Sequence, residues 1–276
     1  MILFGKKKSD CRDLSETVPP PKQEGKLVYK AANLQGIGKR ARQEDSFSFS
    51  NALESDPVGE MGMLITVADG MGGMADGKKA SEAVIRSIST DFREFDREGD
   101  IAAQLEAAVF KAGDEVYSLI GGMGGSTVVT AVIYDEKLYF TSVGDSYIFL
   151  MRNRQLVRLN RSQNIQNEMY LETLSDGSTD PSIANSVQQK EALTQFLGMD
   201  GLEEADSLVK PLDLLPGDVL LLCSDGVAGY VDETCIAECL SFGVPIDMAT
   251  ALDREIRLAD RKYQDNYTAL IVQCRK

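Results

Sequence analysis

The chain has 276 residues, and its hydrophobic fraction of 43% and charged fraction of 26% are those of a globular protein. The net charge of −14 argues against a nucleic-acid-binding protein, whose affinity would come from neutralising phosphates with Lys and Arg. The sequence contains no histidine, which excludes Ser-His-Asp and Cys-His nucleophile systems and histidine-rich zinc sites.

Residues 1–24 are predicted to form a flexible tail in front of a single globular domain at residues 25–276. The stretch "KKKSDCRDLSETVPPPKQEG" is polar, contains three consecutive prolines and has no periodicity. The start, "MILFGKKKSD", has its basic cluster on the wrong side of a short apolar run for a secretory signal. No apolar run reaches the ~20 residues of a membrane-spanning helix. We therefore expect a cytoplasmic protein.

From Lys26 onward, short strands and long amphipathic helices follow one another. Strands are predicted at 26–36, 46–50, 61–70, three or four times within 126–160, at 216–226 and at 265–274. Helices are predicted at 78–95, 101–120, 187–198, 232–243 and 247–261. Residues 160–187 are polar and weakly patterned, which predicts a mobile flap. Long helices set against antiparallel strands indicate the α+β class, with the domain built as a sandwich.

Acidic residues stand at the ends of four predicted strands. Asp69 and Asp225 each follow a buried strand and precede a glycine. Asp265 begins the last strand, and Asp45 lies just before the strand at 46–50. A single Asp-Gly pair is more simply a turn, because the dipeptide suits positive backbone dihedrals. Four carboxylates at strand ends favour one shared site instead, and such a cluster needs protons or cations to offset its repulsion.

The residue types available at this cluster indicate which cation it would hold. Carboxylates, backbone carbonyls and water form an all-oxygen site, which suits Mg²⁺ or Mn²⁺ better than zinc or copper. Two such ions, about 3.5–4 Å apart, share a carboxylate bridge, activate a water to hydroxide and clamp a phosphoryl group for in-line attack. The sequence therefore admits phosphoryl hydrolysis without a histidine.

Six motifs, in order, resemble those of the metal-dependent serine/threonine protein phosphatases, the PPM or type 2C family, in its bacterial form. The motifs are "RARQEDS", "VADGMGG", "GGSTVVTAVI", "VGDSY", "LLCSDG" and "DNYTALIV", and the similarity runs from about Gly36 to Val272. The resemblance implies a four-layer α-β-β-α sandwich, in which two antiparallel sheets pack face to face and helices flank both outer sides. It also implies a metal site at one end, between the sheets.

The resemblance implies a role for each matching residue. Asp69 would bridge both ions, and the carbonyl of Gly70 would bind one of them. Asp225 and Asp265 would hold the other ion. Arg40 matches the arginine that grips phosphate, for which a guanidinium fork is suited.

Two neighbouring acids and one turn acid complete the set implied by the family. Glu44 and Asp45 fall where the family holds metal-bound waters. Asp145 matches an aspartate that some members use for a third, weaker ion. A hairpin-turn role for Asp145 is equally open, because the family's further aspartate is replaced by Gly229.

The chain departs from the family pattern at several other positions. Tyr147 follows Gly-Asp-Ser where Arg is common, Gln43 replaces an asparagine, and the flap entry reads "NRSQN" instead of Asp-His-Ser. Met71 stands where some members have the histidine assigned as general acid. These departures bear on substrate preference, on the third ion and on the leaving-group acid, and they leave the metal-ligand positions intact.

The resemblance implies a Mn²⁺- or Mg²⁺-dependent hydrolase that removes phosphate from phosphoserine and phosphothreonine. Its partners would be phosphorylated proteins, among them a Ser/Thr kinase of the same cell and the targets of that kinase. One alternative is a phosphatase-shaped binding or sensing module with weak or no catalysis. Another is a dinucleotide-binding enzyme, because a strand leads into Gly70-x-Gly72-x-x-Ala75 and then a helix.

Overall fold

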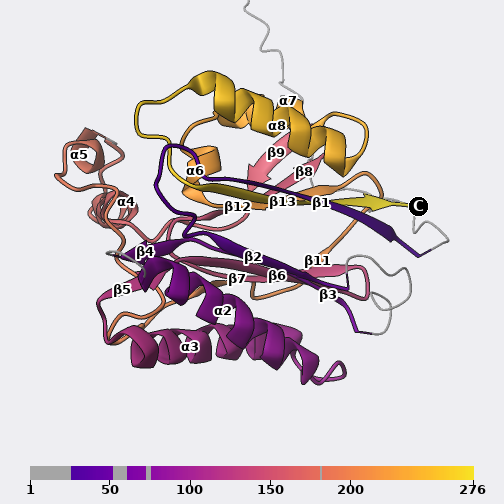
Figure 1. The fold of residues 1–276 in the computed structure, drawn as a ribbon, viewed down its shortest axis with the longest axis horizontal. Coiled ribbons are helices and arrows are strands. Elements are labelled where there is room, and N and C mark those ends of the chain that lie inside the picture. Colours follow the sequence, from indigo (N-terminus) through magenta and orange to yellow (C-terminus); the bar gives the residue numbers. More distant parts are fainter. Residues whose placement is uncertain (1–25, 52–60, 73–75, 181) are drawn as a thin grey trace, which may run out of the picture.

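Two antiparallel sheets pack face to face, and a pair of long helices covers each outer side (Figure 1). The computed structural model describes residues 26–51, 61–72, 76–180 and 182–276. The expected tail at residues 1–24 lies outside the described residues. The layers run helix, sheet, sheet, helix, which confirms the predicted α+β sandwich.

The first sheet, here called sheet I, contains five strands with antiparallel neighbours. Their order across the sheet is β1 (Val28–Gly36), β13 (Tyr267–Arg275), β12 (Val219–Cys223), β8 (Tyr147–Arg152) and β9 (Gln155–Arg158). The last strand of the chain thus lies between the first strand and β12, so sheet I joins distant parts of the sequence.

The second sheet, sheet II, is also antiparallel. Its order is β10 (Asp206–Ser207), β7 (Lys137–Val143), β6 (Val128–Tyr134), β3 (Met63–Ala68) and β2 (Ser46–Ser50), and β11 (Leu212–Asp213) also pairs with β7. A separate ribbon pairs β4 (Gly70–Gly72) with β5 (Gly124–Ser126). Because β3 lies in an antiparallel sheet, the dinucleotide-binding alternative, which needs parallel strands, is wrong.

Each outer side carries an amphipathic helix pair. The helices α2 (Asp76–Arg93) and α3 (Ile101–Ile120) cover sheet II, whereas α7 (Glu233–Leu240) and α8 (Pro245–Ala259) cover sheet I (Figure 1). Asp100 caps α3 by accepting a hydrogen bond from the Ala103 amide at 3.1 Å. Among the residues described, none of the helices is both long and apolar enough to pass through a membrane.

Strand β12 shows why its sequence is apolar at every position. Val219 and Leu221 face α7 and α8, while Leu220 and Leu222 face the other sheet. Successive side chains of a strand point to opposite faces, so a strand covered on both faces loses the alternation of polar and apolar residues. The buried run therefore continues up to Cys223, where the chain turns toward the site.

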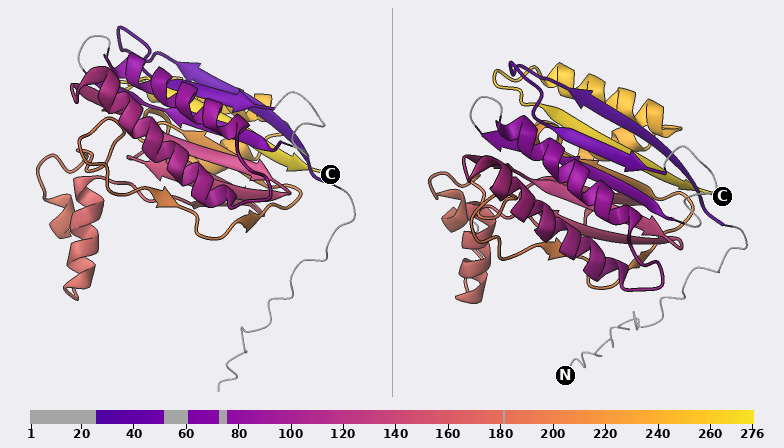
Figure 2. Two further views of the ribbon diagram at one scale, coloured as in Figure 1. Left: turned by 90° about the horizontal axis from the view of Figure 1, so that it is seen from below. Right: turned by 60° about the horizontal axis from the view of Figure 1, so that its bottom comes forward.

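The segment between β9 and β10 differs from the sequence-based expectation. The predicted helix at 187–198 is wrong, because Leu197 is buried and exchanges backbone hydrogen bonds of 2.9 and 2.8 Å with Ser126. The segment expected to form a flap at 160–187 contains α4 (Ile165–Ser175) and α5 (Ser182–Asn185), and its mobility stays a prediction. Both helices project from one end of the sandwich (Figure 2).

Candidate metal centre and active site

Strand pairing brings the predicted acids to one end of the sandwich. In sheet I, β12 and β13 are antiparallel neighbours with Cys223 opposite Ala269, so Asp225 after β12 and Asp265 before β13 lie at the same end. In sheet II, Ser46 is opposite Ala68, which likewise places Asp45 before β2 beside Asp69 after β3. Each sheet therefore contributes two carboxylates.

Asp69 is the electrostatic centre of this group. Burial raises the pKa of Asp69 well above its usual range, and the nearby charges of four other aspartates raise it further; these are Asp45, Asp225, Asp265 and Asp145. Asp69 is close enough to Asp45 and Asp225 to share a hydrogen bond with each carboxyl. Asp69 is half-buried, so part of the residue still contacts solvent. The five acids thus form one interacting cluster.

Asp45 is the most buried member, with no exposed surface. Its Oδ2 accepts a hydrogen bond of 2.9 Å from the Ser224 hydroxyl. Burial raises the pKa of Asp45 to about 6, hydrogen bonds from Thr268 and Ser224 offset part of this shift, and the charge of Asp225 adds to it. Its second oxygen, Oδ1, has no hydrogen-bond partner.

The unpartnered oxygens fit a divalent cation. Oδ1 of Asp45 and Oδ1 of Asp225 are both buried and without a hydrogen-bond donor. Burial and the charge of Asp265 raise the pKa of Asp225. Buried oxygens of this kind are costly unless a donor or a cation satisfies them, and hard oxygen ligands are those that Mg²⁺ and Mn²⁺ prefer.

Arg40 contacts one carboxylate of the acidic cluster. Its guanidinium forms an ion pair with the Asp265 carboxylate, although 57% of the Arg40 side chain is exposed. The hydrogen bond to Asp265 raises the pKa of Arg40. As the side chains stand, no three acidic or thiol residues in the described part of the chain are arranged to hold one metal ion. The structure thus brings the acids to one rim, with Arg40 engaging one of them.

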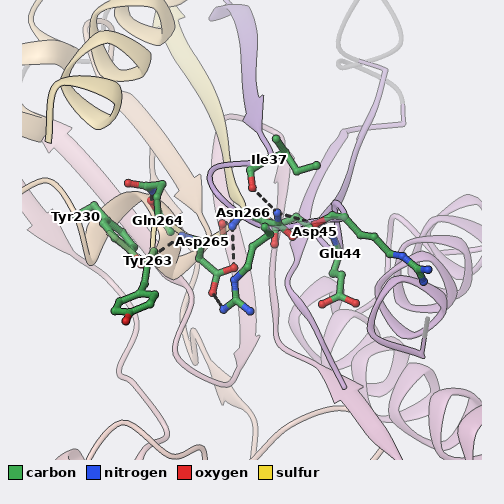
Figure 3. A network of polar contacts seen from close by, with 12 residues as sticks. Ile37, Glu44, Asp45, Tyr230, Tyr263, Gln264, Asp265 and Asn266 are labelled. Atoms are coloured by element: carbon green, nitrogen blue, oxygen red, sulfur yellow. Dashed lines mark hydrogen bonds and ion pairs between the residues drawn. The ribbon is translucent and has the colours of Figure 1, made fainter. Parts of the chain in front are cut away.

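Gly70 and Glu44 lie where β4 meets the start of α2. A Cβ on Gly70 would come within 2.1 Å of the Gly77 carbonyl oxygen and 2.7 Å of the Glu44 carbonyl oxygen, so only glycine fits. A Cβ on Gly77 would lie 3.2 Å from the Glu44 carboxyl carbon. The Glu44 side chain therefore points toward α2 and away from Asp265 (Figure 3).

Asp145 occupies the turn between β7 and β8. Burial raises its pKa to about 7, the charge of Asp225 adds to the shift, and the positive charge of Arg158 opposes it. The Arg158 guanidinium lies 4.0 Å above the ring of Tyr147, which stabilises it there. Asp145 thus belongs to the acidic cluster, and the guanidinium of Arg158 is close enough to offset part of its charge.

Three contributors to the site were not predicted from the sequence. Ser224 hydrogen-bonds Asp45, and its position beside Asp225 in "LLCSDG" was the signal available. Tyr230 accepts a 3.3 Å hydrogen bond from the Asp265 amide and donates one of 2.8 Å to the Tyr263 carbonyl. Asn266 bonds the backbone around Arg40. For Tyr230 the sequence offers no local signal.

Residues 42–258 match the family model described as protein phosphatase 2C. The serine/threonine phosphatase stp of Listeria monocytogenes is 32% identical over 210 residues, which cover 73% of this chain and 78% of that protein. The serine/threonine protein phosphatase PstP of Mycobacterium tuberculosis is 30% identical over 255 residues, which cover 89% of this chain and 44% of PstP.

Solved structures agree with the sequence relatives. The structure of the M. tuberculosis phosphatase PstP/Ppp has a TM-score of 0.73 and 26% identity, covering 90% of this chain and 100% of that one. The catalytic domain of PstP in complex with 2 manganese ions has the same fold, with a TM-score of 0.71, 24% identity and coverage of 91% and 100%. Since the family model spans most of the chain and the relatives agree with it, the chain belongs to the protein phosphatase 2C family and is a bacterial PPM-type serine/threonine protein phosphatase.

Proposed function

We propose that the protein removes phosphate from phosphoserine and phosphothreonine with two divalent cations, Mn²⁺ or Mg²⁺, held at the acidic rim. The observation that supports this most directly is the meeting of Asp45, Asp69, Asp225 and Asp265 from two sheets, with two buried carboxylate oxygens lacking a donor. Manganese in the PstP structure favours the same metal here.

The proposed ligands follow from the residues at the rim. Asp69 and the Gly70 carbonyl would hold one ion, and Asp69, Asp225 and Asp265 the other. When bound, the ions would neutralise the carboxylates and the phosphoryl group and activate a water for direct attack on phosphorus, without a phosphoenzyme.

The chain's own residues would position the reactants. The Ser224 hydroxyl fixes Oδ2 of Asp45, which leaves Oδ1 available to accept a hydrogen bond from a water. Glu44 would hold a second water. Arg40, largely exposed, would leave Asp265 and place its guanidinium fork on two phosphate oxygens.

A third ion at Asp145 would be held more weakly. Gly229 supplies no carboxylate at the position where the family's further aspartate stands, and Arg158 already offsets part of the charge at Asp145. The positive neighbour would lower cation affinity there relative to the main site.

The test is hydrolysis of p-nitrophenyl phosphate with Mn²⁺ and with EDTA. We expect turnover only with the metal, and a loss of at least about 100-fold in Asp225→Asn, which keeps the shape but removes the charge. Asp232→Asn is the matched control, because Asp232 is exposed and caps α7, and Asn also caps a helix.

Three kinds of outcome would contradict the proposal. Turnover that persists in EDTA, or in a folded Asp225→Asn variant, would remove the metal from the reaction. Mn²⁺ binding by calorimetry without turnover on any phosphopeptide would instead favour the non-catalytic binding module. A phosphoenzyme trapped during turnover would contradict direct attack.

The natural substrates are proposed to be phosphorylated proteins, among them a Ser/Thr kinase of the same cell and its targets. The relatives named above are serine/threonine phosphatases, which supports the substrate class. Phosphoproteomics of a strain lacking the protein should show raised phosphoserine and phosphothreonine occupancy at these targets, reversed by the wild-type gene and not by Asp225→Asn.

A further inference from the structure

The Asn266 side chain is committed entirely to the backbone that carries Arg40. Its Nδ2 donates hydrogen bonds to the carbonyl oxygens of Ile37 at 2.9 Å and Arg42 at 3.0 Å, and its Oδ1 accepts one from the Glu44 amide at 2.8 Å. Asn266 is only 4% exposed. Figure 3 shows this side chain between Asp265 and the segment leading to Asp45. One buried carboxamide therefore spans residues 37–44, here called the arginine loop.

Neighbouring residues hold the arginine loop against the same stretch of chain. The Lys39 amide donates a 2.9 Å hydrogen bond to the Gln264 carbonyl. Gly38 has a φ of +60°, and a Cβ there would lie 2.2 Å from the Asp265 carbonyl oxygen. The arginine loop therefore packs against residues 264–266, and these contacts restrict its backbone conformation.

Asn266 also contacts the segment that carries Asp225. A Cβ on Gly226 would lie 1.8 Å from the Asn266 carbonyl oxygen, so the two backbones touch. The Asn266 amide donates a 2.8 Å hydrogen bond to Oδ1 of Asp265. Three segments that bear proposed functional residues therefore meet at this one position.

We propose that Asn266 is a positioning residue that sets the phosphate-gripping geometry of Arg40. Because 57% of the Arg40 side chain is exposed, packing does not fix it, and its placement depends on the backbone of the arginine loop. A loop whose backbone conformations are restricted holds the guanidinium near its phosphate-binding position. Phosphate binding then does not have to order the loop, which would cost conformational entropy. The inference rests on the proposed role of Arg40 in phosphate binding.

Only an amide side chain serves this arrangement. The two carbonyls require donors and the Glu44 amide requires an acceptor, which Asn supplies from one planar group. Asn266→Asp keeps the size and the acceptor but replaces both donors with an oxygen that repels the carbonyls of Ile37 and Arg42. Asn266→Ala removes all three hydrogen bonds and leaves a small cavity.

Asn160 provides a matched control. It is 5% exposed, and its carboxamide also makes three hydrogen bonds, to the Ile148 amide, the Ser142 hydroxyl and the Ser146 carbonyl. None of these partners lies in the arginine loop. Asn160→Ala therefore carries a comparable loss of buried hydrogen bonds without touching Arg40.

The experiment measures inhibition by inorganic phosphate, the KM and kcat for p-nitrophenyl phosphate with Mn²⁺, and backbone hydrogen exchange of residues 37–45. We expect both Asn266 variants to raise the phosphate Ki and the KM about tenfold, with a smaller fall in kcat, because Asp69 and Asp225 stay in place. Exchange in the arginine loop should accelerate in Asn266→Ala. Asn160→Ala should lower Tm comparably but leave the phosphate Ki and the exchange of this loop unchanged.

Two results separate the failure of this inference from failure of the proposed function. If Arg40→Ala weakens phosphate inhibition but neither Asn266 variant does, Asn266 is only structural and the inference is overturned. If Arg40→Ala itself leaves phosphate inhibition unchanged, the role of Arg40 on which the inference rests is wrong, whatever Asn266 does.

Discussion

At the scale of single residues, the acidic cluster holds carboxyl groups that water solvates poorly. Asp45 has no exposed surface, and its Oδ1 has no hydrogen-bond partner. Asp69 feels the charges of four other aspartates. Without a cation, protons have to offset this repulsion, so the metal-free protein and the metal-bound protein should respond to pH in different ways.

The metal-free protein should lose stability as pH rises. The pKa of Asp45 is raised to about 6 and that of Asp145 to about 7, so between the unfolded value of 3.8 and these values the folded chain holds protons that the unfolded chain has released. Stability therefore falls as pH rises through this range. In EDTA, Tm should decline from about pH 4 to about pH 7, and Mn²⁺ should remove most of that decline.

A variant isolates the contribution of one carboxyl. Asp45→Asn has the same shape and cannot ionise, so the slope of Tm against pH in EDTA should flatten, whereas Asp232→Asn should keep the wild-type slope. A Tm that rises between about pH 4 and about pH 7 in EDTA would show that repulsion among the carboxylates does not destabilise the metal-free protein.

At the scale of elements, an ion pair with a buried carboxylate joins the strands that carry the site. Arg152 at the end of β8 donates hydrogen bonds of 2.9 and 2.7 Å to the two carboxylate oxygens of Asp218, just before β12. Asp218 is 1% exposed and also accepts from the Leu215 amide at 2.8 Å. The pair closes the end of sheet I away from the acidic rim.

Removing one partner should leave the other charge uncompensated. We expect Asp218→Ala to lower the free energy of unfolding by about 3 kcal/mol, measured by urea denaturation. Lys111→Ala, which breaks an exposed pair with Asp91, should leave the urea midpoint nearly unchanged. Equal effects of the two variants would contradict the distinction between buried and exposed pairs.

Local patterns predicted most elements but not how they meet. The helix predicted at 101–120 has the bounds of α3, because apolar residues at helical spacing and the Asp100 cap agree. The predicted helix at 187–198 is wrong, since pairing of Leu197 with Ser126, 71 positions away in sequence, overrode local propensity. The sequence also could not show which strand lies beside which.

The same limit applies to the candidate site. Asp69 and Asp225 could be predicted because a buried strand ends beside an Asp-Gly pair in each case. The contact of Ser224 with Asp45 joins residues 179 positions apart, and that of Asn266 with Ile37 joins residues 229 apart. Such contacts follow from strand order, which no local pattern records. Whether the predicted acids bind metal stays a prediction.

At the scale of the whole molecule, a chain with a net charge of −14 has to admit an anionic phosphate to its site. Bound cations and Arg40 would attract the phosphate at short range, while the acidic surface would favour positive residues around it. The chain should therefore prefer phosphosites with neighbouring Lys or Arg.

Phosphopeptides that differ only in flanking charge test this preference. At low salt, kcat/KM should be higher for a phosphothreonine peptide flanked by Arg than for the same peptide with Gln in place of Arg. The ratio should shrink as salt rises toward conditions where the Debye length is about 3 Å. A ratio near one at low salt, or one insensitive to salt, would count against long-range attraction.

The pairing of β12 with β13 has a consequence for how the site can change over evolution. Asp225 follows β12, and Asp265 precedes β13. The two strands are paired from Val219, opposite Gln273, to Cys223, opposite Ala269. A slip of one residue would shift one acid by about 3.4 Å and turn every neighbouring side chain to the other face. The register of this strand pair therefore fixes the distance between the two carboxylates. Insertions should be tolerated in the loops beyond the paired residues, whereas an insertion within the five residues of β12 should disrupt the site.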